Sequence, residues 1–250
     1  MSEANRTVSF GYRDVVPEEK PALVGEIFSS VAPRYDLMND LMSAGVHRLW
    51  KNAFVDWLNP RSGQAILDVA GGTGDIALRI IERTRAKGGA AVTVCDINRE
   101  MLTQGIRRTE AKTAAIAWLC GDAENLPIES ESQDAYVIAF GIRNVTHLDK
   151  ALAEAYRVLK PGGRFLCLEF SRVMAPGLEE LYDLYSFAVL PKLGEIVAGD
   201  GAAYRYLAES IRRFPPQGVF AKLIGVAGFS QVKVRNLSGG IAAMHSGWKV

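Results

Sequence analysis

Residues 65–75 read AILDVAGGTGD, an apolar run that leads directly into a cluster of glycines. The run is typical of a buried β-strand, and the residues that follow it have helical spacing. Glycines let the backbone turn sharply and let a ligand approach where a Cβ atom would clash. Because α/β folds bind ligands at the carboxyl edge of the sheet, this stretch predicts both the fold and the position of its site.

Further strand-like runs alternate with helical patterns along the chain. The expected strands are residues 65–70, 92–96, 116–122, 135–140 and 164–170, and the expected helices are 75–87, 99–112, 149–160 and 219–227. Two final runs, 231–238 and 240–250, predict an antiparallel pair at the edge of the sheet. We therefore expect an α/β fold with a mostly parallel seven-stranded sheet and helices on both faces.

Two segments do not follow this alternation. Residues 17–58 have helical patterns with breaks at Pro17 and Pro33, so residues 1–60 are expected to form an N-terminal helical cap. Residues 174–213 are expected to be an inserted helical segment that covers the substrate, although burial in the core is the simpler interpretation of their apolar stripe. The whole chain, residues 1–250, is expected to be one domain.

Composition excludes several classes of protein. The 29 basic and 28 acidic residues leave a net charge of +1, so no global field favours nucleic acid as a partner. No run approaches the roughly 20 apolar residues that cross a bilayer, and the N-terminus lacks the hydrophobic stretch of a signal peptide, which favours a cytoplasmic protein. The cysteines and histidines are scattered, so no metal site is expected. The oligomeric state is left open.

The glycine loop alone fits two kinds of cofactor. Residues 72–77 match the G-x-G-x-x-A form of a dinucleotide-binding loop, and Asp96 ends the second strand, where a ribose-binding acid belongs. Tyr156 and Lys160 also form the Y-x-x-x-K pair of short-chain dehydrogenases. We expect that pair to serve helix packing instead, with Lys160 compensating the dipole at the end of its helix.

Three features favour S-adenosylmethionine over a dinucleotide. Asp68 precedes the glycines, where a carboxylate suits the cationic amino-acid end of that ligand and would repel a pyrophosphate. Asp122 and Ala123 lie at the end of the third strand beside the expected adenine pocket, and Pro161–Gly163 introduces the fifth strand. Together the strings LDVAGGTGD, VCDIN, GDAENLP and VLKPGGRFLCLEF resemble the motif series of class I methyltransferases, whose fold is Rossmann-like.

Flanking strings make the resemblance more specific. VAPRYDLMND, HRLWK, FGIRNVT, YRYLAESI and NLSGGI closely resemble those of the ubiquinone and menaquinone biosynthesis C-methyltransferase family, from about Val31 to the end of the chain. The resemblance implies methylation of a ring carbon of a polyprenyl benzoquinol or of demethylmenaquinol. It also implies that the cofactor is bound by the loop and strand-end residues Asp68, Gly72, Thr73, Gly74, Asp96, Asp122 and Ala123. At Ala139, where the family often has serine, only a backbone contact could remain.

The resemblance places Arg143 and Asn144 in the substrate pocket as catalytic residues. Carbon methylation needs electron density on the ring, which loss of the adjacent hydroxyl proton promotes. Arginine is a poor base because its pKa exceeds about 12, so Arg143 is expected to stabilise a phenolate or orient a water while Asn144 positions the ring oxygen. The alternative for Arg143 is a structural role, binding carbonyl groups at the strand end. Weaker candidates are Tyr35, Asp36, Tyr185, Tyr204 and His245.

A polyprenyl substrate also implies contact with a membrane surface or with other proteins of quinone synthesis. We expect an apolar channel between segments 34–57 and 178–206, with Arg48, Lys51, Lys192 and Arg205 around its mouth. Two alternatives stay open: a methyltransferase for another small hydrophobic acceptor, and a non-catalytic subunit that only binds S-adenosylmethionine.

Overall fold

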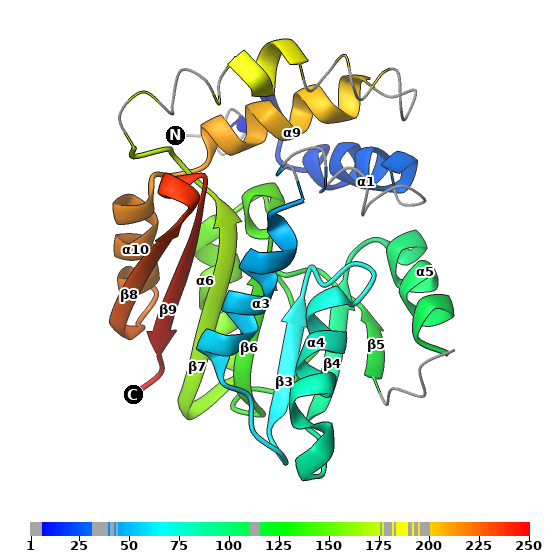
Figure 1. The fold of residues 1–250 in the computed structure, drawn as a ribbon, viewed down its shortest axis with the longest axis vertical. Coiled ribbons are helices and arrows are strands. Elements are labelled where there is room, and N and C mark those ends of the chain that lie inside the picture. Colours follow the sequence, from blue (N-terminus) through cyan, green and yellow to red (C-terminus); the bar gives the residue numbers. More distant parts are fainter. Residues whose placement is uncertain are drawn as a thin grey trace.

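A seven-stranded sheet forms the centre of the molecule (Figure 1). The structure is a computed structural model that describes residues 7–31, 40, 43, 45–110, 116–175, 177, 182, 184–189, 192, 195 and 201–250. The strand order is β5-β4-β3-β6-β7-β9-β8, in which only β9 runs antiparallel to its neighbours β7 and β8. The strands are β3 (Ala65–Val69), β4 (Ala91–Asp96), β5 (Ile116–Cys120), β6 (Gln133–Ala139), β7 (Leu159–Phe170), β8 (Ser230–Leu237) and β9 (Ala242–Trp248). The predicted sheet is thus confirmed.

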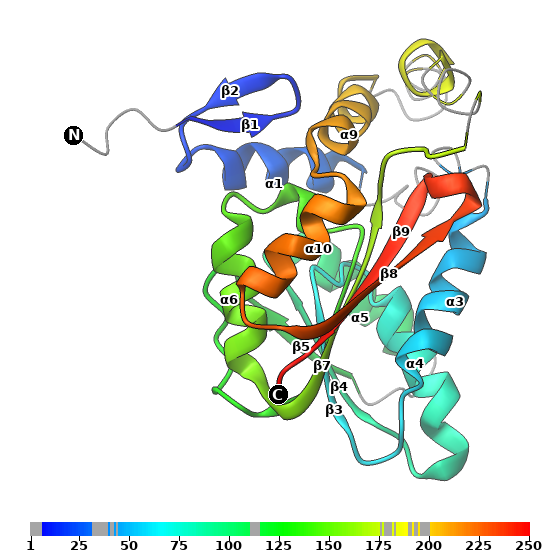
Figure 2. The ribbon, with the colours of Figure 1, turned by 90° about the vertical axis from the view of Figure 1, so that its left-hand side faces the viewer.

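Helices cover both faces of the sheet, as the alternating pattern predicts (Figure 2). One face packs against α3 (His47–Leu58), α4 (Asp75–Thr84) and α5 (Arg99–Glu110), and the other against α6 (Leu148–Val158) and α10 (Gln217–Val226). Each face has its own cluster of buried apolar side chains, because the strands are apolar on both sides. The helices and strands that carry the site are therefore held by two cores.

A third group of elements lies across the carboxyl ends of the strands (Figures 1 and 2). It contains α1 (Lys20–Val31), α9 (Gly201–Arg213) and a hairpin of β1 (Val8–Phe10) and β2 (Arg13–Val15). Helix α9 contacts both α1 and β1. Short helical turns complete the described structure: η2 (Arg85–Lys87), η3 (Ile142–Asn144), the π-helical turn η4 (Tyr185–Val189) and η5 (Ser238–Gly240). This group covers the edge where the glycine loop lies.

The prediction of a helical cap over residues 1–60 needs two corrections. Helix α3 covers the face of the sheet instead of its edge, because Trp50, Phe54, Val55 and Leu58 lie on one side of the helix and are buried in the core. Residues 8–15 form a hairpin that the sequence pattern did not reveal. Of the elements described within the expected cap, α1 is the helix that lies over the edge.

The predicted role of Lys160 is also wrong. Helix α6 ends at Val158, and Lys160 lies in β7, where its ammonium forms a 2.9 Å ion pair with Asp134. Tyr156 lies under the ammonium of Lys249 and packs edge-on against Phe229. The pair is structural, but its lysine anchors two strands and does not compensate a helix dipole.

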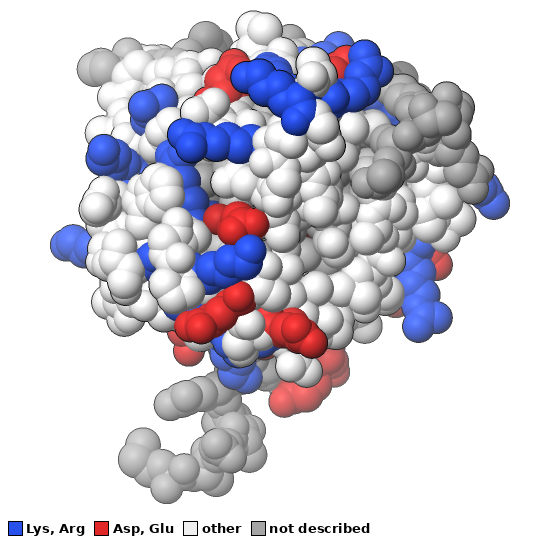
Figure 3. Space-filling view, turned by 90° about the horizontal axis from the view of Figure 1, so that it is seen from below, with Lys and Arg blue, Asp and Glu red and all other residues white. Residues whose placement is uncertain are grey.

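The face shown in Figure 3 carries basic and acidic side chains together, in keeping with the net charge of +1. Within the described residues, no helix is both long and apolar enough to cross a bilayer.

Candidate active site

The glycine loop joins β3 to α4 and lines a pocket at the carboxyl edge of the sheet. Gly72 has a φ of +56° and Gly74 a φ of +76°, values in the left-handed region that favours glycine. A Cβ atom on Gly74 would also lie 2.7 Å from the ring of Trp118, too close for any real contact. The loop therefore requires glycine both for its backbone conformation and for its packing under β5.

Asp96, at the end of β4, fixes the glycine loop from the neighbouring strand. One carboxylate oxygen accepts a 2.8 Å bond from the backbone N–H of Gly72, and the other a 2.8 Å bond from the N–H of Asn98. Burial raises the pKa of Asp96, and these two N–H donors oppose that rise. A carboxylate can accept about four hydrogen bonds, so Asp96 keeps acceptor capacity toward the pocket that it lines.

Asp68 lies within β3 beside the loop and is fully buried. One of its oxygens accepts a 3.1 Å bond from the N–H of Ala77 at the start of α4. Its other oxygen, Oδ1, has no hydrogen-bond partner within the described part of the chain. Burial, with smaller contributions from Asp75 and Asp96, raises its pKa to about 8. A buried acceptor without a partner is costly, so this oxygen is suited to a polar or cationic group of a ligand.

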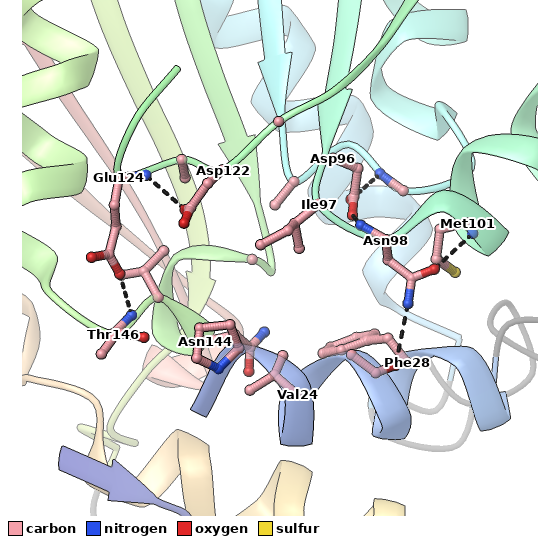
Figure 4. A pocket seen from close by; sticks show the side chains of 18 of the residues that line it. Val24, Phe28, Asp96, Ile97, Asn98, Met101, Asp122, Glu124, Asn144 and Thr146 are labelled. Atoms are coloured by element: carbon pink, nitrogen blue, oxygen red, sulfur yellow. Dashed lines mark hydrogen bonds between the residues drawn. The ribbon is translucent and has the colours of Figure 1, made fainter. Parts of the chain in front are cut away.

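The loop after β5 forms the opposite side of the pocket (Figure 4). Asp122 accepts a 2.9 Å bond from the N–H of Glu124, which turns the chain so that Asp122 and Ala123 line the pocket. The carboxylate of Glu124 accepts hydrogen bonds from the backbone N–H groups of Thr146 and His147 and contacts the His147 ring at 2.8 Å. Glu124 thus ties the β5 loop to the segment after β6.

Helix α1 supplies a wall of the pocket that no sequence motif indicates. Pro21, Val24 and Phe28 recur at helical spacing and line the pocket on the side away from the sheet. Asn98 holds this wall in place, since its side-chain NH₂ donates to the carbonyl of Gly25 at 3.2 Å and to the hydroxyl of Ser29 at 2.9 Å. The apolar periodicity of residues 21–28 was the only signal in the sequence for this wall.

The two predicted catalytic residues are adjacent in η3 but face different surroundings. Asn144 lines the pocket. Arg143 is buried, and its guanidinium pairs with the carboxylate of Glu169 at 2.9 Å, bonds to the carbonyl of Phe140 and donates to the hydroxyl of Ser210 at 3.3 Å. Because its donors are used inside the protein, this geometry favours the structural alternative for Arg143 over direct contact with a substrate.

The remaining predicted residues either do not line the pocket or lie outside the described chain. Thr73 is buried within the glycine loop, and Ala139 ends β6 and packs partly against the core. His245 is buried against Phe220, with a pKa lowered by burial to about 4. Tyr35 and Asp36 lie outside the described residues, as do parts of the expected channel. Among the described residues, no three His, Cys, Asp or Glu side chains gather into a metal site.

A second depression opens between the hairpin, α1 and α9. Its lining includes the apolar and aromatic side chains of Phe10, Tyr12, Ile27 and Tyr206, together with the charged side chains of Arg13, Lys192, Glu195, Arg205 and Glu209. Two of the four basic residues expected around a channel, Lys192 and Arg205, are therefore beside this groove. Lys51 is not: it is buried, and its ammonium lies 2.8 Å from the carboxylate of Asp75. That prediction was wrong because α3 packs on the sheet.

Comparison with solved structures agrees with this architecture. A methyltransferase of Thermotoga maritima, described as S-adenosylmethionine-dependent, superposes with a TM-score of 0.63 at 23% identity, covering 90% of this chain and 99% of that one. Phosphoethanolamine N-methyltransferase 2 of Haemonchus contortus, solved with S-adenosyl-L-methionine, gives a TM-score of 0.59 at 17% identity, over 80% of this chain and 52% of that one. At such identities the likeness shows the fold.

Comparison of sequences is more specific. The chain is 58% identical to the ubiquinone/menaquinone biosynthesis C-methyltransferase of Paracoccus denitrificans, over 96% of each chain. It is 54% identical to the mitochondrial 2-methoxy-6-polyprenyl-1,4-benzoquinol methylase of rice, over 98% of this chain and 90% of that one. The profile of the ubiE/COQ5 methyltransferase family matches residues 13–249, almost the whole sequence. These matches exclude the dehydrogenase interpretation, and the chain belongs to the ubiE/COQ5 methyltransferase family of S-adenosylmethionine-dependent enzymes.

Proposed function

We propose that this enzyme methylates a ring carbon of a polyprenylated quinol, either 2-methoxy-6-polyprenyl-1,4-benzoquinol or demethylmenaquinol. The observation that carries the proposal is the identity of 54–58% to two relatives whose names specify quinone biosynthesis and the benzoquinol. Both matches extend over nearly the whole chain, so they include α1 and α9 around the pocket as well as the sheet.

The residues around the pocket are suited to S-adenosylmethionine, which supplies a methyl group on a positively charged sulfur. Asp96 lines the pocket and retains lone pairs for two ribose hydroxyls. Asp68 is fully buried behind the lining residues, and its unpartnered Oδ1 would accept from the ammonium of the amino-acid part. Gly72 and Gly74 keep the loop open to the ligand, with Thr73 between them. Asp122 and Ala123 would meet the adenine, and Ala139 would contribute through its backbone.

When bound, S-adenosylmethionine would supply the methyl group to a ring carbon and leave as S-adenosylhomocysteine. The ring carbon would give up its hydrogen as a proton to water. We assign to Asn144 the role of binding the substrate. Its amide N–H can donate a hydrogen bond to the ring oxygen and stabilise the negative charge that makes the ring carbon nucleophilic. Arg143 positions Asn144 indirectly, because its bonds to Phe140, Glu169 and Ser210 hold η3 in place.

We assign the groove between the hairpin, α1 and α9 to the isoprenoid tail. An isoprenoid chain partitions strongly into a bilayer, at about 0.8 kcal/mol for each buried CH₂-sized group, so the enzyme must meet its substrate at a membrane or receive it from a partner. The apolar floor of the groove suits the tail. Arg13, Lys192 and Arg205 at its rim suit anionic lipid headgroups. On this assignment the described part of segment 174–213 covers the substrate.

The proposal is tested by incubating the purified chain with S-adenosylmethionine and each reduced quinol, followed by mass spectrometry of the products. The expected product is heavier by one methylene unit, with the added methyl on a ring carbon. Transfer to a simple phenol or sterol at a higher kcat/KM than to either quinol would favour another hydrophobic acceptor. Cofactor binding without transfer to any acceptor would favour the non-catalytic subunit.

A further inference from the structure

Asn144 is held from outside the pocket by a tyrosine of α9. The phenol of Tyr206 donates a 3.1 Å hydrogen bond to the side-chain carbonyl oxygen of Asn144. Tyr206 is buried, with 5% of its surface exposed, whereas Asn144 reaches the pocket. The hydroxyl therefore touches the proposed substrate-binding amide from outside the pocket.

The direction of this hydrogen bond determines which group of the Asn144 amide, the oxygen or the NH₂, is available to the pocket. Burial raises the pKa of Tyr206 to about 12, so the phenol keeps its proton and acts as a donor at neutral pH. An asparagine amide has one oxygen acceptor and one NH₂ donor group. When the phenol occupies the oxygen, the NH₂ group is the part that remains for the pocket. A phenolate oxygen on the substrate requires such a donor.

Tyr206 is itself fixed by two neighbouring elements. Its ring stacks on Phe10 of β1, with centroids 4.4 Å apart and planes at 26°. One turn further along α9, Ser210 accepts a hydrogen bond from the guanidinium of Arg143. Helix α9 thus holds two successive residues of η3, and the N-terminal hairpin packs behind the contact to Asn144.

We propose that Tyr206 is a positioning residue for methyl transfer, which fixes the rotation of the Asn144 amide so that its NH₂ group faces the ring oxygen of the substrate. This inference rests on the proposed function, because it takes the substrate to be a quinol bound by Asn144. Tyr206 does not touch the reacting atoms. It acts by limiting the orientations of the group that does, and a freely rotating amide would present its oxygen to the developing negative charge part of the time.

The first test is Tyr206→Phe, which removes the hydroxyl and retains the ring that stacks on Phe10. We expect kcat for quinol methylation to fall about tenfold, which is the effect of losing one hydrogen bond of ordinary strength. The KM for S-adenosylmethionine and the melting temperature should stay close to those of the wild type. Tyr136→Phe is the matched control, since it removes the hydroxyl of another buried tyrosine in the opposite core, away from the pocket. It should leave kcat unchanged.

A double-mutant cycle distinguishes positioning from a general structural effect. If Tyr206 acts through Asn144, the Tyr206→Phe change should lower kcat in the wild-type background and have no further effect in Asn144→Ala. Equal effects of Tyr206→Phe in both backgrounds would overturn the inference. So would an unchanged kcat in the single variant, or a fall in kcat that follows a fall in melting temperature.

Failure of the proposed function gives a different result. In that case the wild-type chain does not methylate either quinol, so there is no kcat for the variants to change. The contact itself can then be followed by NMR of the Asn144 side-chain NH₂ group in the protein with S-adenosylhomocysteine. Tyr206→Phe should shift and broaden this signal, and Tyr136→Phe should not. An unshifted signal would overturn the positioning role even without turnover.

Discussion

The guanidinium of Arg143 lies 2.9 Å from the carboxylate of Glu169, and both side chains are almost completely buried. Burial raises the pKa of Glu169, and the charge of Arg143 together with backbone N–H donors opposes this rise. Each charge is therefore tolerated in the core because the other is present. The pair links η3 to the end of β7 and stands directly behind the pocket.

The main effect of Arg143→Ala should be a lower free energy of unfolding, and not a direct loss of methyl transfer. Removing one partner of a buried ion pair leaves the other charge uncompensated, at a cost of about 3–5 kcal/mol in the free energy of unfolding. Urea denaturation would measure this difference. Arg48→Ala is the control, since its ion pair with Asp40 is largely exposed on the arginine side and should contribute less than about 1 kcal/mol. A stable Arg143→Ala variant with strongly reduced kcat would restore the direct catalytic role expected from the sequence.

Asp96→Asn should weaken binding of S-adenosylmethionine. The carboxylate of Asp96 is a charged acceptor for Gly72 and Asn98 and, in our proposal, for the ribose hydroxyls. Loss of a charged acceptor costs about 1.5–3 kcal/mol, which corresponds to a ten- to hundredfold higher Kd. Isothermal titration calorimetry measures this value directly. Asp149→Asn, on the exposed start of α6, should bind normally; an unchanged Kd for Asp96→Asn would refute the assignment.

The pKa of Asp68 predicts how stability depends on pH without ligand. Its pKa is about 8 in the folded chain and 3.8 for an aspartate in water, so between these values the folded state binds a proton that the unfolded state has released. The contribution of Asp68 to stability is thus fully present below about pH 4 and is lost as the pH rises toward 8. The slope is up to about 1.4 kcal/mol per pH unit for one proton.

Asp68→Asn cannot release this proton, so it isolates the effect of Asp68 from that of other groups. Between about pH 6 and pH 8.5, a window that ends just above the folded pKa, urea denaturation should show the wild type losing stability relative to the variant. Parallel pH dependences of the two proteins would show that Asp68 is already ionised when buried, contrary to the expectation.

The sequence predicted well those parts of the structure that are determined by residues within the same short segment. Each parallel strand from β3 to β7 has its own apolar run, and glycine at positions 72 and 74 directly indicates the left-handed backbone of the loop. Asp96 and Asp122 could be placed because parallel strands bring their carboxyl ends to the same edge. Local patterns were sufficient wherever a residue and its function belong to the same element.

Predictions failed where a residue's role depends on a distant element. The core-facing side of α3 is amphipathic in sequence, but nothing local says whether it meets the sheet face or its edge. The partner of Arg143 is Glu169, 26 positions away, and the partner of Asn144 is Tyr206, 62 positions away. Neither pairing has a spacing that a motif could reveal. The hairpin of β1 and β2 has only three residues in each strand, too few for a clear alternating pattern.

The groove between the hairpin, α1 and α9 leads to a last prediction, on the use of a membrane-bound substrate. Arg205 lines this groove from the exposed side of α9, so Arg205→Glu should not disturb the core. A basic residue near an anionic bilayer contributes about 1 kcal/mol, and reversing its charge should weaken binding to phosphatidylserine vesicles by about tenfold or more. The matched control is Arg85→Glu, an exposed arginine in η2 at the opposite end of the sheet.

With a long-chain quinol in the vesicles, Arg205→Glu should raise the apparent KM at low salt, and the difference should shrink as salt screens the charges. With a short-chain quinol in solution, both variants should match the wild type. If the two arginine variants behave alike in the vesicle assay, the rim of this groove does not face the membrane and the tail must reach the pocket by another route.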